Sequence, residues 1–178
     1  MARIPYAQPK NRDQRSTASN IGRALANAPE LAPFFGKLVM HLRHDTKIDP
    51  RLRELAILQV GYVTKTEYEW VHHVEEARKV GVSDAEIRAI ADETAGRDGG
   101  FDPLARAVLK AAREMTTDIA VSDATYAVLQ QHLDNERMVE LFMSIATYNA
   151  VVRFLSSIKI DLEDDCRHIL TEFPLGAN

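Results

Sequence analysis

The sequence predicts an all-α protein, and three observations support this prediction. Apolar residues recur with the periodicity of helices over most of the chain. Glycine and proline are sparse, with 8 Gly and 7 Pro in 178 residues, and they fall between the periodic stretches. Serine, aspartate or asparagine precedes several of these stretches, in the position of a helix N-cap. We therefore expect a bundle of about seven to eight helices.

The expected helices are delimited by caps and by proline. Pro29 ends the first helix, and Asp49 is well placed as an N-cap with Pro50 at the first helical position. Ser83 and Glu86 form a capping-box pattern, and Gly81 is suited to end the preceding helix. A short tail helix is also compatible with the acidic segment after residue 160. In chain order, the expected helices span residues 19–28, 30–44, 50–63, 67–80, 84–94, 103–117, 123–133 and 135–160.

The chain reads as one domain preceded by an arm. Residues 1–18 are polar and contain Pro5 and Pro9, so we expect an extended N-terminal arm. Residues 19–178 are expected to form a single helical domain, which is an ordinary length for one hydrophobic core.

Composition and charge exclude several classes of protein. Hydrophobic residues make up 46% of the chain and charged residues 27%, which is typical of a globular protein. The net charge is −4, whereas nucleic-acid binding requires clustered Lys and Arg. No apolar run approaches the roughly 20 residues of a membrane span, and the N-terminus lacks the apolar core of a secretory signal. We expect a cytoplasmic protein without a membrane or nucleic-acid partner.

Two of the expected helices, residues 51–63 and 136–159, are apolar over most of their circumference. A helix of this kind is buried between neighbours. Together the two present more apolar surface than one small bundle usually covers, and interfaces of obligate oligomers resemble a domain core. We therefore expect a homo-oligomer.

A carboxylate and a histidine share one helical face in the segment after residue 66. Glu69 and His73 are four positions apart, and Trp70 continues that side as part of an apolar stripe. A carboxylate beside an imidazole orients the ring and raises its basicity, which suits a general acid or base. Glu54, which opens a very apolar helix, is a second candidate for a shifted pKa. The structural alternatives are a surface ion pair and stabilisation by the helix dipole.

Metal and thiol chemistry are not expected. His72 and His73 are adjacent, so they diverge around a helix and cannot both bind one ion. Cys166 is the only cysteine, which excludes an intramolecular disulfide, a CxxC motif and a thiolate zinc site. Neighbouring carboxylates should raise the pKa of this thiol, so it is a poor nucleophile.

Residues 50–90 resemble the core of the carboxymuconolactone decarboxylase family, which includes the alkylhydroperoxidase D-like proteins. The resemblance is carried by an R-x-R-E-L apolar helix, then E-Y-E-W-x-x-H, then A-R-x-x-G-V-S-x-x-E-I. A looser likeness covers residues 140–153, where Tyr148, Asn149 and Arg153 match a Y-N-x-x-x-R segment. The resemblance implies an alkylhydroperoxidase D-like helical bundle and a homo-oligomer, commonly a trimer or hexamer.

The peroxidase branch of this family combines two redox cysteines with a glutamate–histidine proton relay. Aligned on that pattern, Glu54 matches the relay glutamate and His73 the histidine, but Thr66 and Glu69 occupy the cysteine positions. The resemblance therefore transfers the relay and not the peroxidase activity. The decarboxylase branch, which acts on a carboxylated butenolide, needs no redox centre.

The resemblance and the residue pattern together predict a cofactor-free lyase or isomerase that acts by proton transfer on a small carboxylated or lactone-type metabolite. The expected catalytic residues are His73, Glu69 and Glu54. Substrate-binding roles are expected for Tyr68, Tyr148, Asn149 and Arg153. Two alternatives stay open, an alkylhydroperoxidase-like antioxidant protein and a non-catalytic binding protein that kept the family fold.

Overall fold

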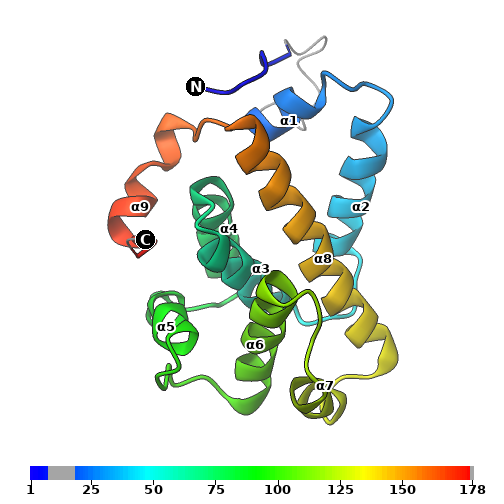
Figure 1. The fold of residues 1–178 in the computed structure, drawn as a ribbon, viewed down its shortest axis with the longest axis vertical. Helices are drawn as coiled ribbons and strands as arrows, with labels where there is room; N and C mark the ends of the chain where they lie inside the picture. Colours follow the sequence, from blue (N-terminus) through cyan, green and yellow to red (C-terminus); the bar gives the residue numbers. More distant parts are fainter. Residues whose placement is uncertain (8–18, 177–178) are drawn as a thin grey trace.

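The computed structural model describes residues 1–7 and 19–176. Within these residues it contains nine α-helices, one short 3₁₀ helix and no strand, so the all-α prediction is confirmed (Figure 1). The α-helices are α1 (Asn20–Leu25), α2 (Ala32–His44), α3 (Pro50–Thr64), α4 (Glu67–Lys79), α5 (Asp84–Thr94), α6 (Pro103–Thr117), α7 (Asp123–Gln130), α8 (Asn135–Ile158) and α9 (His168–Glu172). The 3₁₀ helix is η2 (Asp164–Cys166).

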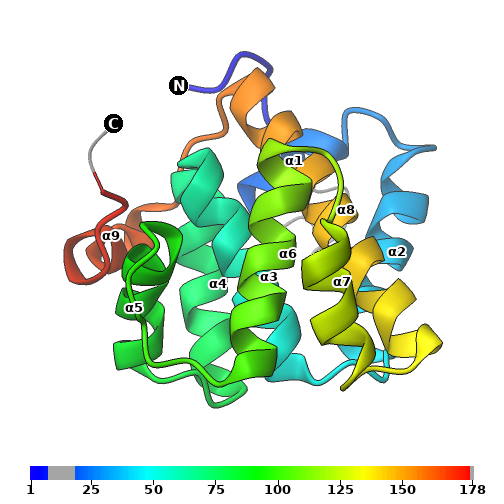
Figure 2. The ribbon, with the colours of Figure 1, turned by 60° about the horizontal axis from the view of Figure 1, so that its bottom comes forward.

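Helix α3 is the centre of the bundle. It packs against α4, α5, α6 and α8, and every residue from Leu52 to Gly61 is buried. Figure 2 shows α3 with α4 on one side and α6 on the other. The apolar circumference predicted for this helix is therefore covered inside one chain. It needs no second subunit to bury it.

The predicted caps are present. Asp49 accepts hydrogen bonds from the backbone N–H groups of Arg51 and Leu52, with Pro50 in the first turn of α3. Ser83 and Glu86 form the predicted capping box at the start of α5. These local interactions satisfy N–H groups that have no partner within the helix. They therefore fix where α3 and α5 begin.

Three helices end two or three residues earlier than the sequence predicts. Helix α1 stops at Leu25, since the side chain of Asn27 donates to the carbonyl of Ala24 and closes the turn. Helix α7 stops at Gln130, three residues before Leu133, and helix α8 stops at Ile158. In α8 the next residue, Lys159, takes a left-handed conformation with φ of 52° and caps the helix.

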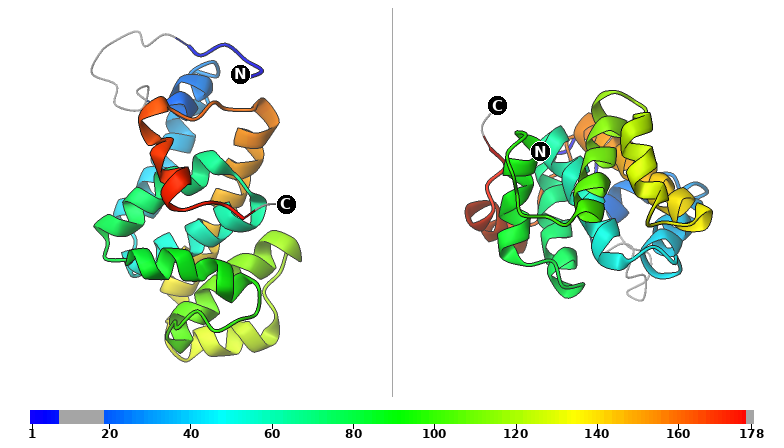
Figure 3. Two further views of the ribbon diagram at one scale, coloured as in Figure 1. Left: turned by 90° about the vertical axis from the view of Figure 1, so that its left-hand side faces the viewer. Right: turned by 90° about the horizontal axis from the view of Figure 1, so that it is seen from below.

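The two ends of the described chain pack on the bundle (Figure 3). The N-terminal amine pairs with Asp161 at 2.8 Å, and the backbone of Arg3 donates to the carbonyl of Ile158. The predicted arm of residues 1–18 therefore begins against the end of α8, while residues 8–18 lie outside the described residues. At the other end, the Trp70 indole donates to the carbonyl of Phe173 at 2.8 Å, which holds the tail against α4.

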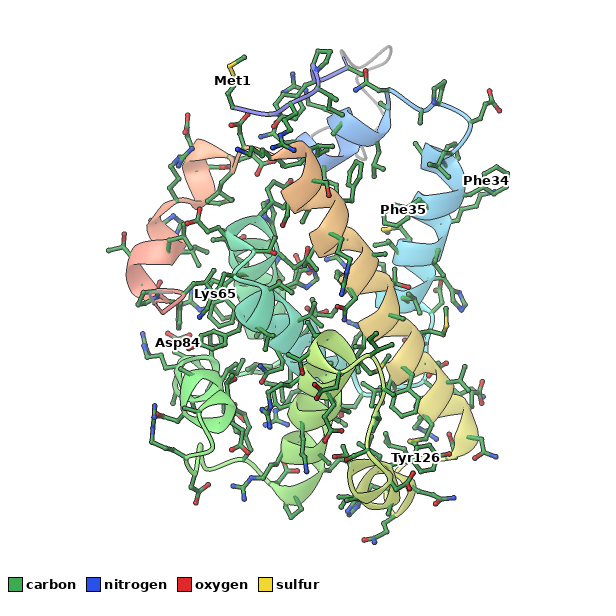
Figure 4. The ribbon with its side chains drawn as sticks, in the orientation of Figure 1. Met1, Phe34, Phe35, Lys65, Asp84 and Tyr126 are labelled. Atoms are coloured by element: carbon green, nitrogen blue, oxygen red, sulfur yellow. The ribbon has the colours of Figure 1, made fainter. Side chains whose placement is uncertain are left out.

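Exposed apolar side chains concentrate on α2 and α8. On α2 they include Phe34, which points away from the bundle in Figure 4, whereas Phe35 points inward. On α8 they include Val139 and Met143. Helix α8 is also long and apolar enough to cross a membrane by length and composition alone, and half of its most apolar window is buried inside the bundle. Central helices of helical bundles share these properties.

Candidate active site

Helices α3 and α4 form a hairpin whose close approach builds the site. A Cβ atom placed on Gly61 would lie 3.3 Å from the backbone nitrogen of Trp70, which leaves little room for any side chain. Gly61 is seven positions after Glu54, so both residues lie on the face of α3 that meets α4. The missing side chain at Gly61 therefore brings Glu54 within reach of α4.

His73 lies between two buried carboxylates. Its Nδ1 atom is 2.6 Å from Oε2 of Glu54, and its Nε2 atom is 3.0 Å from Oε1 of Glu69. The first contact is a hydrogen bond; the second is an ion pair by distance, and Oε1 of Glu69 has no hydrogen-bond partner among the described residues. All three side chains are at most 8% exposed. Nδ1 is thus held by Glu54, and Nε2 is the less restrained nitrogen.

The carboxylates keep His73 protonated at neutral pH. Burial alone lowers the pKa of His73, but the charges of Glu69 and Glu54 outweigh it and raise that pKa to about 9. Burial raises the pKa of Glu54, yet His73 and the guanidinium of Arg53 outweigh it and lower that pKa below the ordinary value. The site therefore contains an imidazolium with a carboxylate on each side.

Tyr148 and Arg53 complete the inner part of the site. The Tyr148 ring meets the His73 ring edge-on, with centroids 4.8 Å apart. Burial, Glu69 and Glu54 all raise the pKa of Tyr148, so it stays a neutral phenol. Arg53 donates from Nε and Nη2 to Oε1 of Glu54, at 3.3 and 3.2 Å. Glu54 thus has cations on both of its oxygens.

Two further charged residues, which sequence reasoning did not single out, border the site. Arg43 on α2 pairs with Glu76 on α4 at 2.8 Å. Glu76 follows His73 by one turn, so it continues the same face of α4. No sequence pattern marks this pair, because the two residues come from helices that are not consecutive.

Three predicted substrate-binding residues lie elsewhere. The Tyr68 hydroxyl donates to Glu163 and accepts from the backbone of Ile21, so it holds α1 and the tail. The Asn149 amide donates to Thr116 on α6, and Arg153 donates to the side chain and carbonyl of Asn149. Tyr148 and Asn149 are consecutive on α8 and point about 100° apart. Only Tyr148 of the four faces His73.

Two surface hollows lie away from His73. One, of about 370 Å³, lies between α6 and α7; it is lined by Phe101, Pro103, Arg106, Ala107, Lys110, Ala124, Thr125 and Val128. The other, of about 240 Å³, lies at the start of α4 and the end of α8; it is lined by Lys65, Thr66, Glu67, Tyr68, Leu155, Ser156, Lys159 and Ile160. The buried acid–base cluster belongs to neither hollow.

The side chains present do not provide thiol or metal chemistry at this site. Thr66 Oγ1 is hydrogen-bonded to Thr64 Oγ1 at 2.9 Å, and Glu69 contacts His73, so neither family cysteine position carries sulfur. Cys166 lies in η2, where burial and Asp165 raise its pKa to about 11. In the described part of the chain, no group of three or more His, Cys, Asp or Glu is arranged to hold a metal ion.

The helical bundle and the buried glutamate–histidine cluster define an alkylhydroperoxidase D-like fold. Residues 29–114, which contain Glu54, Glu69 and His73, match the model of the carboxymuconolactone decarboxylase family. This part of the chain belongs to that family. No curated protein matches the sequence.

Solved structures share the fold at low sequence identity. A cysteine-to-alanine variant of the debrominase Bmp8 in complex with 2,3,4-tribromopyrrole has a TM-score of 0.78 at 19% identity, and the match covers 97% of this chain and 100% of that one. The alkylhydroperoxidase AhpD core of an uncharacterized peroxidase-related protein from Ralstonia eutropha JMP134 has a TM-score of 0.76 at 18% identity, covering 92% and 93%. These similarities establish the fold.

Proposed function

We propose that this protein is a cofactor-free lyase or isomerase that transfers a proton to or from a carbon of a small carboxylated or lactone-type metabolite. The observation that carries the proposal is the position of His73, within 2.6 and 3.0 Å of two carboxylates on different helices. In this buried imidazolium, Nδ1 is hydrogen-bonded to Glu54 while Nε2 makes no assigned hydrogen bond. Such an arrangement suits general acid–base chemistry at Nε2. The family match over residues 29–114 supports the same class of reaction.

In the proposed mechanism His73 acts first as an acid. Loss of a carboxyl group as CO₂ leaves an electron pair delocalised toward the lactone carbonyl. In an isomerisation, the Glu69 carboxylate takes a proton from carbon to form the same electron pair and later releases that proton to solvent. The carbon then takes the proton from Nε2 of His73, and solvent returns a proton to the ring. Glu54 keeps the ring oriented through Nδ1, and Glu69 stabilises its charged form. Tyr148 packs against the ring and limits the space for the substrate.

The test is proton exchange and turnover in D₂O. Carboxylated butenolides and the corresponding lactones are incubated with the protein, and deuterium incorporation at carbon and loss of the carboxyl group are followed by NMR. His73→Gln should lower the rate by roughly two to four orders of magnitude. Glu54→Gln should also lower it, and the double variant should lose less than the product of the two effects, because the pair acts as a unit.

The two alternatives predict different results. An alkylhydroperoxidase-like protein would consume peroxide with a dithiol reductant, and such activity would overturn the proposal. A binding protein that kept the fold would cause no deuterium incorporation in any lactone of the panel. Thermal melting of each variant serves as the control, because a lower turnover rate is evidence for a catalytic role only when the variant stays folded.

A further inference from the structure

A stripe of three titratable side chains runs along α4 from the interior to the surface. Glu69, His73 and Glu76 are spaced four and three positions apart, so they share one face of the helix. The side chains of Glu69 and His73 are 5% and 8% exposed, whereas that of Glu76 is 31% exposed. The buried acid–base cluster therefore reaches solvent at Glu76.

Arg43 lies at this outer end of the stripe. It comes from α2 and pairs with Glu76 at 2.8 Å, with 26% of its side chain exposed. Burial lowers the pKa of Arg43, but Tyr148, Glu76 and Glu54 outweigh it and raise that pKa. The guanidinium thus lies close enough to the carboxylate of Glu54, in the inner cluster, to interact with it electrostatically.

The cluster holds as many carboxylates as cations, and one of the carboxylates has an alternative partner. Arg43, Arg53 and protonated His73 are cationic, and they face the carboxylates of Glu54, Glu69 and Glu76. Glu76 has a second cationic partner, the exposed Lys79, at 2.8 Å. A Glu76 side chain that paired with Lys79 alone would leave the inner cluster with one more positive than negative group. An anionic substrate beside Arg43 would restore the balance in a partly buried site, where charge pairing is stronger than in open solvent.

We propose that Arg43 binds the carboxylate of the substrate and that Glu76 occupies this position until the substrate arrives. The inference rests on the proposed function, because it places the reacting carbon at His73. Glu76 and His73 are about 4.5 Å apart along the helix axis at 1.5 Å per residue. This spacing fits a small acid whose carboxylate is one or two bonds from the reacting ring atom. At the inner end, Oε1 of Glu69 has no hydrogen-bond partner among the described residues and can accept one from the ligand.

The experiment compares two probes that differ in one charge, 5-oxotetrahydrofuran-2-carboxylate and its methyl ester. Binding of each to the purified protein is measured by NMR titration, so the result does not depend on turnover. Arg43→Gln removes the proposed receptor, and Lys37→Gln removes the same charge from an exposed position on the same helix. Arg43→Lys keeps the charge and loses the two-pronged hydrogen bonding of the guanidinium.

Arg43→Gln should weaken carboxylate binding by about 10- to 100-fold and leave ester binding unchanged within about twofold. Arg43→Lys should have an intermediate effect, Lys37→Gln almost none, and Glu76→Gln should tighten carboxylate binding. Equal losses for both probes, an unchanged affinity in folded Arg43→Gln, or no carboxylate binding by the wild-type protein at 10 mM would overturn the inference. Arg43-dependent binding without deuterium exchange in any lactone would retain this inference and refute the proposed function instead.

Discussion

Nδ1 of His73 lies 2.6 Å from Oε2 of Glu54, although the residues are 19 positions apart and belong to different helices. With Glu69 on the other side of the ring, this contact makes a buried cation that depends on two anions. Replacement of any member leaves a buried charge without its partner, which is costly. Stability and proton transfer are therefore linked at this cluster.

The first prediction concerns the balance of charges around His73. His73→Gln should lower the free energy of unfolding by about 3 kcal/mol, because two carboxylates are then buried without the imidazolium. Glu69→Gln added to that variant should recover part of the loss, since it removes one of the unmatched charges. Urea denaturation of the single and double variants measures both effects. A double variant less stable than His73→Gln would show that Glu69 does not depend on the imidazolium.

The second prediction is a loss of stability at alkaline pH. The pKa of His73 is about 9 in the folded protein against an ordinary value of 6.5, so the folded state binds the proton more tightly. The resulting stabilisation is complete below about pH 6.5 and disappears as the pH rises through about 9, and it amounts to about 3 kcal/mol. Unfolding free energies measured from pH 6 to 10 should show this decline, and His73→Gln should flatten it.

The third prediction concerns the approach of α3 and α4 at Gly61. Gly61→Ala should destabilise the protein by about 1 to 3 kcal/mol, because the new methyl group meets the backbone of Trp70. It should also reduce proton transfer, since the displaced helices separate Glu54 from His73. The matched control is Gly36→Ala in α2, where a Cβ meets nothing within 4 Å. This control should gain stability, by about 0.5 to 1 kcal/mol. Equal changes in stability for Gly61→Ala and Gly36→Ala would contradict the close approach of α3 and α4 at Gly61.

The fourth prediction is that the Cys166 thiol takes no part in proton transfer. Cys166→Ser should leave proton transfer and melting temperature nearly unchanged, because the thiol lies in η2 with its pKa raised to about 11. Lactone exchange rates and melting curves of the two proteins provide the comparison. If Cys166→Ser alone abolished lactone exchange, the reaction would have to involve the C-terminal segment that contains Cys166.

The fifth prediction is a homo-oligomer that uses the exposed apolar side chains of α2 and α8. Phe34 and Val139 are 72% and 61% exposed, and they lie on the two helices that carry most of the exposed large apolar side chains. Apolar side chains gathered in this way mark interaction surfaces, whereas single ones do not. Phe34→Asp combined with Val139→Asp should reduce the sedimenting mass to the 20.0 kDa of one chain. Ile119→Asp, at a residue 87% exposed in the α6–α7 connection, is the control and should leave the mass unchanged. A wild-type protein that sediments as a monomer at micromolar concentration would refute the prediction.

The sequence by itself determined the helical architecture and the core of the candidate site. Caps at Asp49 and Ser83 are local interactions, so the residues within one turn are enough to locate them. The pairing of Glu69 with His73 follows from helical spacing, because residues four apart share a face. The family resemblance predicted that Glu54 acts together with His73. Helical spacing could not predict this, because the two residues are 19 positions apart and lie on different helices.

Only the tertiary structure decided which remaining residues join the cluster. Tyr148 faces His73 while its neighbour Asn149 faces Thr116, because the way α8 packs determines which of its sides meets His73. Arg43, in the last turn of α2, reaches Glu76 on α4, a contact that no periodicity encodes. Helix spacing is set within a few residues of the chain, whereas contacts between helices depend on the fit of whole surfaces. The pairing of Glu69 with His73 could therefore be predicted from the sequence, whereas the position of Arg43 beside the cluster could not.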